Sequence, residues 1–161
     1  MKKTSKKGVT IISTSEAETI AFGRRLAHFL KPRMILALEG TLGSGKTTLT
    51  KGIVDGLFRT KKIKVTSPSF ALVNQYDGSF PVFHIDCYRL NEIKDYEEIG
   101  IDEFLFSSGI AIIEWSEKIK TLLPKRSIFI KLSHNGENRR KFLIKSNDVK
   151  FISLLRRRLN V

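Results

Sequence analysis

The chain has 161 residues, of which 41% are hydrophobic and 11 are Phe, so it is long enough to bury the core of one domain. No apolar run approaches the roughly 20 residues that cross a bilayer, and the basic start is not followed by the apolar segment of an export signal, so we expect a cytoplasmic protein without membrane contact. The single cysteine, Cys87, excludes an internal disulfide framework and a multi-cysteine metal site.

The net charge of +13 lies mainly at the two ends of the chain. Residues 1–8 carry +4 and residues 139–161 carry +7, which leaves +2 for residues 9–138. Basic ends are commonly solvated arms, although contact with RNA or with an acidic protein is the alternative, and no RNP-type aromatic motif accompanies them. We expect a single domain over residues 1–161, with a disordered tail at 1–8 and a basic helix at 146–161.

The first elements are a short strand over Val9–Ile12 and a helix that follows it. Ser15–Glu18 has the Ser-x-x-Glu pattern of a capping box, which favours a helix start, and Pro32 marks a stop after Leu30. The apolar positions of this helix predict one packing face, made of Ala17, Ile20, Ala27 and Leu30.

A phosphate-binding loop is predicted directly after Met34–Glu39, a branched apolar run typical of a buried strand. Gly40, Gly45, Lys46 and Thr47 fit the spacing G-x-x-x-x-G-K-[ST]. The glycines allow backbone N–H groups to turn inward around an anion, and Lys46 adds positive charge for the β- and γ-phosphates. Thr47 places a hydroxyl where it can reach Mg²⁺. The pattern therefore predicts a nucleoside triphosphate site.

The helix after the loop is predicted over Lys46–Phe58, because apolar residues recur every four positions at Leu49, Ile53 and Leu57. A basic connector leads to the hydroxyl-rich stretch Val65–Phe70. This stretch is either a plain turn fixed by Pro68 or a switch that senses the γ-phosphate, and both interpretations stay open.

A β-hairpin is predicted next, with strands Ala71–Tyr76 and Pro81–Ile85 joined at Asp77-Gly78. The second strand delivers Asp86 to its carboxyl end. A carboxylate in that position is typical of a Walker B element, which holds Mg²⁺ or positions the attacking water.

His84 and Cys87 flank Asp86 and raise the alternative of a transition-metal site. No other cluster of Cys or His is present in the sequence to complete a coordination shell. His84 is more typical of a structural residue held by a hydrogen bond.

A second apolar strand, Gly109–Trp115, also ends in a carboxylate, Glu114, which competes with Asp86 for the metal. Trp115 is either a core anchor or a lid over the nucleotide. Between the two strands, residues 92–103 are rich in carboxylates, which predicts a solvated helical surface or an acidic docking surface.

The remaining elements are strands over Ser127–Leu132 and Lys141–Ile144 around a turn at 134–136, and a C-terminal helix. The helix has a predicted apolar face of Val149, Ile152, Leu155 and Leu159.

Five segments taken in order resemble the bacterial TsaE (YjeE) family: Gly40–Thr48, Ser67–Phe70, His84–Leu90, Glu98–Gly100 and Ile113–Trp115. That family is a small P-loop ATPase needed for threonylcarbamoyladenosine formation in tRNA. The resemblance runs from about Ser13 to Pro124. It implies an α/β, P-loop NTPase-like three-layer fold with a mixed parallel and antiparallel sheet and few helices, and it implies ATP and Mg²⁺ as cofactors.

The resemblance also implies roles for individual residues. Asp86 would be the catalytic carboxylate, and Lys46 and Glu114 would assist it. Mg²⁺ would be held by Thr47 and Glu114, with Asp86 orienting water or metal. The nucleotide would be bound by Glu16, Gly43, Ser44, Gly45, Lys46, Thr47, Thr48, Ser69 and Trp115. The family usually has Thr where this chain has Ser69, which keeps the hydroxyl and loses a methyl group.

By resemblance, the protein is a Mg²⁺-dependent ATPase subunit with weak activity alone. Its cycle would act on a complex with TsaD- and TsaB-like proteins. It would act on tRNA only indirectly, although the basic ends could contact tRNA. A small-molecule or nucleoside kinase is the alternative, although no arginine-bearing lid is evident. A GTPase is disfavoured because the guanine-reading motif N-K-x-D is missing from the sequence.

Overall fold

The computed structural model describes residues 8–161, so the predicted basic tail lies outside the described residues except for Gly8. One seven-stranded sheet forms the centre of the molecule, in the order β1-β7-β6-β2-β5-β4-β3. Its strands are β1 (Gly8–Ser13), β2 (Ile35–Glu39), β3 (Val73–Tyr76), β4 (Val82–Asp86), β5 (Ile110–Glu114), β6 (Ile128–His134) and β7 (Arg140–Lys145). The helices are α1 (Glu16–Ala27), α2 (Lys46–Leu57), α3 (Ile93–Glu98), α4 (Ile101–Leu105), the 3₁₀ helix η1 (Ser116–Ile119) and α5 (Val149–Leu159).

The sheet has a parallel centre and antiparallel margins. β2 pairs in parallel with β5 and β6, and β4 pairs in parallel with β5. β7 runs antiparallel to both β1 and β6, and β3 runs antiparallel to β4 in the predicted hairpin. Parallel strands occur where helices cover both faces, and β2 and β5 are accordingly almost wholly apolar and buried.

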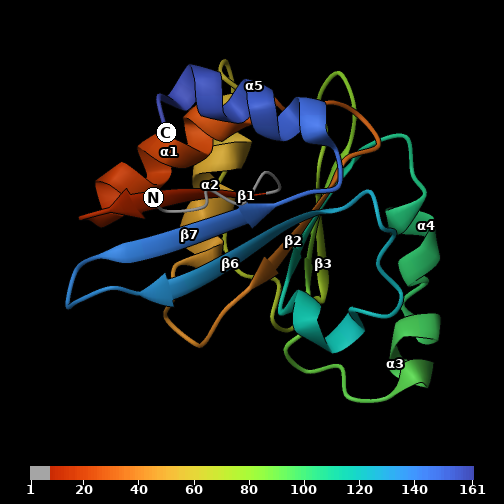
Figure 1. The fold of residues 1–161 in the computed structure, drawn as a ribbon. Coiled ribbons are helices and arrows are strands. Elements are labelled where there is room, and N and C mark those ends of the chain that lie inside the picture. The colour runs from red at the N-terminus through yellow and green to blue at the C-terminus, as the bar shows by residue number, and fades with distance from the viewer. Residues whose placement is uncertain (1–7) are drawn as a thin grey trace.

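Helices cover the two faces of the sheet in different places (Figure 1). On one face, apolar residues of α1, α2 and α5 form a core with alternate residues of β2, β6 and β7, such as Leu36, Ile130 and Phe142. On the other face, α3, α4 and η1 pack over β2, β4 and β5, around residues such as Ala37 and Ile85. This arrangement confirms the predicted three-layer α/β fold with a mixed sheet.

The predicted face of the first helix is wrong in part. One of the two hydrogen bonds of the predicted capping box is present: the Ser15 hydroxyl accepts a hydrogen bond from the Glu18 N–H at 3.1 Å. The helix then ends at Ala27, three residues before the predicted end, and Ala17 is exposed. Its buried residues are Thr19, Phe22, Gly23, Leu26 and Ala27, because the helix turns the small residue Gly23 against α2.

Residues 92–103, predicted as a helical surface or a docking surface, form two short helices, since Gly100 adopts a φ of 66° between them. One further helical expectation needs correction. In α5, Val149 is 56% exposed, and Phe151 takes the predicted core position beside Ile152, Leu155 and Leu159. Val149 is exposed because it occupies the first turn, where the chain leaves β7 and Asp148 caps the helix. Among residues 8–161, no helix is both long and apolar enough to span a membrane.

Candidate functional site

The phosphate loop connects the carboxyl end of β2 to the start of α2, and its shape depends on two glycines. A Cβ at Gly40 would lie 2.5 Å from the Leu132 carbonyl oxygen, so only glycine fits against β6. Gly45 has a φ of 99°, a conformation that side-chain-bearing residues rarely adopt. It is also the N-cap of α2, so the loop leads directly into the positive end of the helix dipole.

Lys46 is held inside the loop. Its Nζ donates hydrogen bonds to the carbonyl oxygens of Gly40 at 2.7 Å and Thr41 at 3.0 Å, and it lies 3.9 Å from the ring centre of Trp115. Burial lowers the pKa of Lys46 from its ordinary value, and nearby Glu114 opposes that change. The loop therefore presents a preorganised, partly desolvated cation where an anion would bind.

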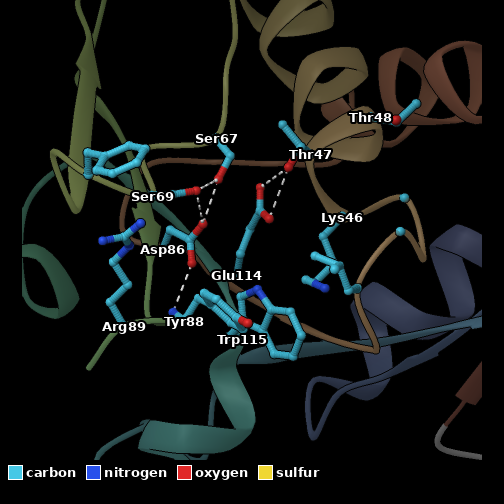
Figure 2. Close-up of a pocket in the computed structure, with 14 residues that line it drawn as sticks. Lys46, Thr47, Thr48, Ser67, Ser69, Asp86, Tyr88, Arg89, Glu114 and Trp115 are labelled. Atoms are coloured by element: carbon cyan, nitrogen blue, oxygen red, sulfur yellow. Dashed lines mark hydrogen bonds between the residues drawn. The ribbon is translucent and has the colours of Figure 1, made fainter. Parts of the chain in front are cut away.

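Two carboxylates stand beside the loop because neighbouring parallel strands end there. Asp86 on β4 and Glu114 on β5 are partners in the strand register, and each is only 2% exposed. The carboxyl ends of parallel strands meet at one edge of a sheet, where ligand sites of open α/β folds lie. Figure 2 shows both side chains between the phosphate loop and the loop that carries Ser67 and Ser69.

Glu114 links the phosphate loop to a buried histidine. Its carboxylate accepts hydrogen bonds from the Thr47 hydroxyl at 2.9 and 3.1 Å. Its Oε1 also lies 2.8 Å from Nε2 of His84, which is fully buried. His84 Nδ1 in turn lies 3.4 Å from the Tyr76 hydroxyl. His84 is hydrogen-bonded, as the sequence indicated, but its partner is a carboxylate of the site.

Asp86 is bound by the hydroxyl-rich loop. Its Oδ2 accepts hydrogen bonds from Ser67 at 2.5 Å and from Ser69 at 3.3 Å, and its Oδ1 accepts the Tyr88 N–H at 2.9 Å. The two serine hydroxyls lie 2.8 Å apart. The loop at 65–70 is therefore attached to the β4 carboxylate through side-chain hydroxyls.

A hollow of about 450 Å³ lies between these groups. Among the predicted site residues, its lining contains Gly43, Gly45, Lys46, Thr47, Thr48, Ser69, Asp86, Glu114 and Trp115. Trp115 adopts a φ of 57° at the end of β5, and its ring packs at 4.8 Å on the ring of Tyr88. The tryptophan thus forms a wall of the hollow.

Two predicted binding residues lie elsewhere. Glu16, at the start of α1, lines a second hollow of about 350 Å³, which shares Gly43, Gly45 and Thr48 with the first. Ser44 lines neither of these two hollows: it is fully buried, and its N–H donates to the Thr41 carbonyl at 3.1 Å. Its buried hydroxyl has no hydrogen-bond partner among residues 8–161.

Several residues that line the two hollows were not among the predicted site residues. Leu42, Phe70, Tyr88 and Arg89 line the first hollow, and Arg140 with Asn138 lines the second. Phe70, Tyr88 and Arg89 lie within the segments Ser67–Phe70 and His84–Leu90 that resemble the family, and this resemblance was a usable signal. Arg140 gave none, because only the pairing of β7 with β6 brings it beside the phosphate loop.

The donor set suits Mg²⁺ better than a softer metal. No group of three or more His, Cys, Asp or Glu side chains gathers as a metal cage within the described part of the chain. Mg²⁺ needs none, because it usually binds one or two carboxylates together with substrate phosphates and water. The hydroxyl of Thr47 and the carboxylate of Glu114, already in contact, are hard oxygen ligands of that kind.

The sheet order, the glycine-shaped loop and the strand-end carboxylates together define an α/β protein of the P-loop class. A family model described as "Threonylcarbamoyl adenosine biosynthesis protein TsaE" matches residues 13–142. The chain belongs to the TsaE family.

Individual relatives agree with this membership. The chain is 39% identical over 124 residues to a tRNA threonylcarbamoyladenosine biosynthesis protein TsaE from Bacillus subtilis, and the matched region covers 76% of each chain. It is 32% identical over 133 residues to the protein of the same name from Treponema pallidum, covering 83% of this chain and 97% of that one. The crystal structure of Bacillus subtilis YdiB superposes with a TM-score of 0.78 at 30% identity, over 96% of this chain and 97% of that one.

Proposed function

We propose that the protein is the ATP-binding and ATP-hydrolysing subunit required for threonylcarbamoyladenosine modification of tRNA. The names of the relatives support the pathway. The observation that carries the ATPase assignment is the pair of buried carboxylates, Asp86 and Glu114, in register on adjacent strands beside the phosphate loop.

In this proposal the phosphate loop binds the triphosphate of ATP. The backbone N–H groups of the loop and the start of α2 surround the phosphates, and Lys46 exchanges its carbonyl partners for phosphate oxygens. Trp115 covers the site from the side of β5. Glu16 reaches the nucleotide from the adjoining hollow.

Thr47 and Glu114 would hold Mg²⁺, which neutralises charge on the phosphates during transfer. Asp86 is the candidate for orienting the attacking water, because its carboxylate is buried and fixed by three hydrogen bonds. His84 fixes Glu114 from the side away from the loop.

The loop with Ser67 and Ser69 would report the state of the nucleotide. Both hydroxyls are bonded to Asp86, so a γ-phosphate that draws on either hydroxyl changes the position of the loop. Ser69 retains the hydroxyl that this role requires. Hydrolysis would then release the contact and shift the loop again.

The partners proposed for this cycle are TsaD- and TsaB-like proteins, which carry out the transfer to tRNA, and the cytoplasm is the proposed location. Hydrolysis would reset their complex after each round. Weak turnover of the isolated protein follows from this coupling, because a switch that cycles without its partners would waste ATP.

The test is ATP turnover measured with the protein alone and with both partners. We expect stimulation by the partners, and a loss of about a hundredfold in Asp86→Asn. Asp77→Asn, which changes an exposed carboxylate in the turn between β3 and β4, is the matched control and should behave as wild type. Vigorous turnover alone that neither the partners nor Asp86→Asn alters would refute the coupling, and transfer of the γ-phosphate to an acceptor other than water would identify a kinase.

A further inference from the structure

Within residues 8–161, no helix covers one part of the second face of the sheet. α3, α4 and η1 cover β2, β4 and β5, but the residues of β1, β7 and β6 that point to the same side are exposed or half-buried. The strand registers place them in three rows: Gly8, Lys145 and Phe129, then Thr10, Leu143 and Lys131, and finally Ile12, Lys141 and Ser133. We call these nine residues the open sheet face.

The open sheet face is basic. Lys131, Lys141 and Lys145 are all exposed, and Lys120 from the end of η1 lines a hollow next to them. Lys141 and Lys145 lie about 13 Å apart along β7, from the ordinary rise per residue, with Lys131 on the neighbouring strand between them. Among the residues that the structure describes, Glu39 is the only acidic side chain lining the hollow, and it pairs with Lys131 at 3.2 Å.

Apolar side chains lie among these lysines. Phe129 and Leu143 are half-buried in the hollow of about 300 Å³, and Ile12 is 48% exposed at the edge strand. A basic surface with an accessible aromatic ring and aliphatic neighbours on a sheet is the chemistry that binds unpaired bases and their phosphates. An acidic protein surface would also match the lysines, whereas a nucleic-acid base would in addition stack on the Phe129 ring.

We propose that the open sheet face binds a single-stranded segment of RNA, with lysines on the phosphates and Phe129 against a base. The proposed function enters only in choosing tRNA as the RNA. The surface is separate from the phosphate-loop hollow, since none of its residues lines that hollow. RNA binding is therefore measured without nucleotide, so that its outcome does not depend on whether the protein hydrolyses ATP.

The test compares two triple variants of the full chain by fluorescence anisotropy with a tRNA transcript. K131Q/K141Q/K145Q removes three charges from the open sheet face, and K31Q/K51Q/K62Q removes three exposed charges elsewhere. We expect the first to weaken binding about tenfold or more and to flatten the slope of log K against log salt by about 2, and the second to change either value little.

A third variant separates RNA from an acidic partner. F129L keeps an apolar side chain, although a smaller one, and removes the ring, so we expect about a fivefold loss of tRNA affinity with an unchanged salt slope. Equal losses in the two lysine variants would overturn the proposal, because net charge alone would explain them. A second pair of results would also overturn the proposal: F129L binds tRNA as tightly as wild type, and polyglutamate competes with tRNA at equal charge concentration. Together they would show that the surface recognises negative charge and not bases.

Discussion

His84 shows how a buried side chain supports the site without reaching the hollow. It is fully buried between Tyr76 and Glu114, and it fixes the carboxylate that also holds the Thr47 hydroxyl. Groups that orient a metal ligand commonly matter for metal affinity nearly as much as the ligand itself. The site therefore extends one layer beneath its lining.

Replacing His84 is expected to weaken Mg²⁺ binding. His84→Leu leaves the inner side of Glu114 without a hydrogen bond, and the concentration of Mg²⁺ needed for ATP binding should rise about tenfold. His84→Gln retains a hydrogen-bonding side chain and should recover part of the loss. Titration of ATP binding with Mg²⁺ gives the comparison, and an unchanged Mg²⁺ requirement in His84→Leu would contradict this role.

Cys87 gives a pH-dependent prediction. Burial raises the pKa of its thiol from 9.0 to about 12, so the folded protein keeps the thiol neutral while the unfolded chain ionises above about pH 9. The stability contributed by the neutral thiol is complete below pH 9 and is lost as the pH rises towards 12. The loss approaches ~1.4 kcal/mol per pH unit.

Urea unfolding of wild type and Cys87→Ala between pH 8 and about pH 10.5 measures this effect. The difference between the two proteins isolates Cys87 from tyrosines and lysines that titrate in the same range. A difference in unfolding free energy that does not change with pH would show that the thiol ionises equally in both states.

Sequence patterns predicted most of the site, because its residues lie next to recognisable local features. The loop residues follow a fixed spacing, and Asp86 and Glu114 each end an apolar strand. Their relative roles depend on which hydroxyl each carboxylate meets, and that follows from the register of β4 with β5. The contact of His84 with Glu114 has the same origin and has no local signal.

At the scale of elements, α1 and α2 pack closely against each other through glycines. A Cβ at Gly52 would lie 2.4 Å from the Ile20 carbonyl oxygen, and a Cβ at Gly23 would lie 2.7 Å from the Leu49 carbonyl oxygen. This close approach explains why Gly23, which the predicted face of α1 leaves out, is buried. Apolar periodicity does not pick out a glycine, although backbone contact between two helices requires a small residue.

Gly52→Ala should therefore destabilise the protein, despite the higher helix propensity of alanine. The added methyl group meets backbone atoms that cannot move independently, and we expect a loss of about 1–3 kcal/mol in unfolding free energy. Lys51→Ala, one residue earlier on the exposed side of α2, is the control and should change stability by less than about 0.5 kcal/mol. Thermal or urea unfolding of both variants measures the change in unfolding free energy. A Gly52→Ala variant that is more stable than wild type would contradict the prediction, because it would show that the two helices separate easily.

At the scale of the whole molecule, the fold class followed from the order of elements, but the distribution of charge did not. Lys141 and Lys145 belong to a region that reads as a basic end, yet both lie in β7, and α5 is packed on the core. The pairing of β1 with β7 joins residues far apart in the chain. Long-range pairing of this kind creates the open sheet face and leaves no trace in local sequence.

In the proposed function, nucleotide turnover at the phosphate loop sustains tRNA modification. Its most direct test is multiple-turnover formation of threonylcarbamoyladenosine with TsaD- and TsaB-like partners, comparing wild type with Lys46→Ala. Lys46 is the cation held within the loop, so the variant should lose sustained formation by about a hundredfold. Sustained formation at the wild-type rate by Lys46→Ala would contradict the account.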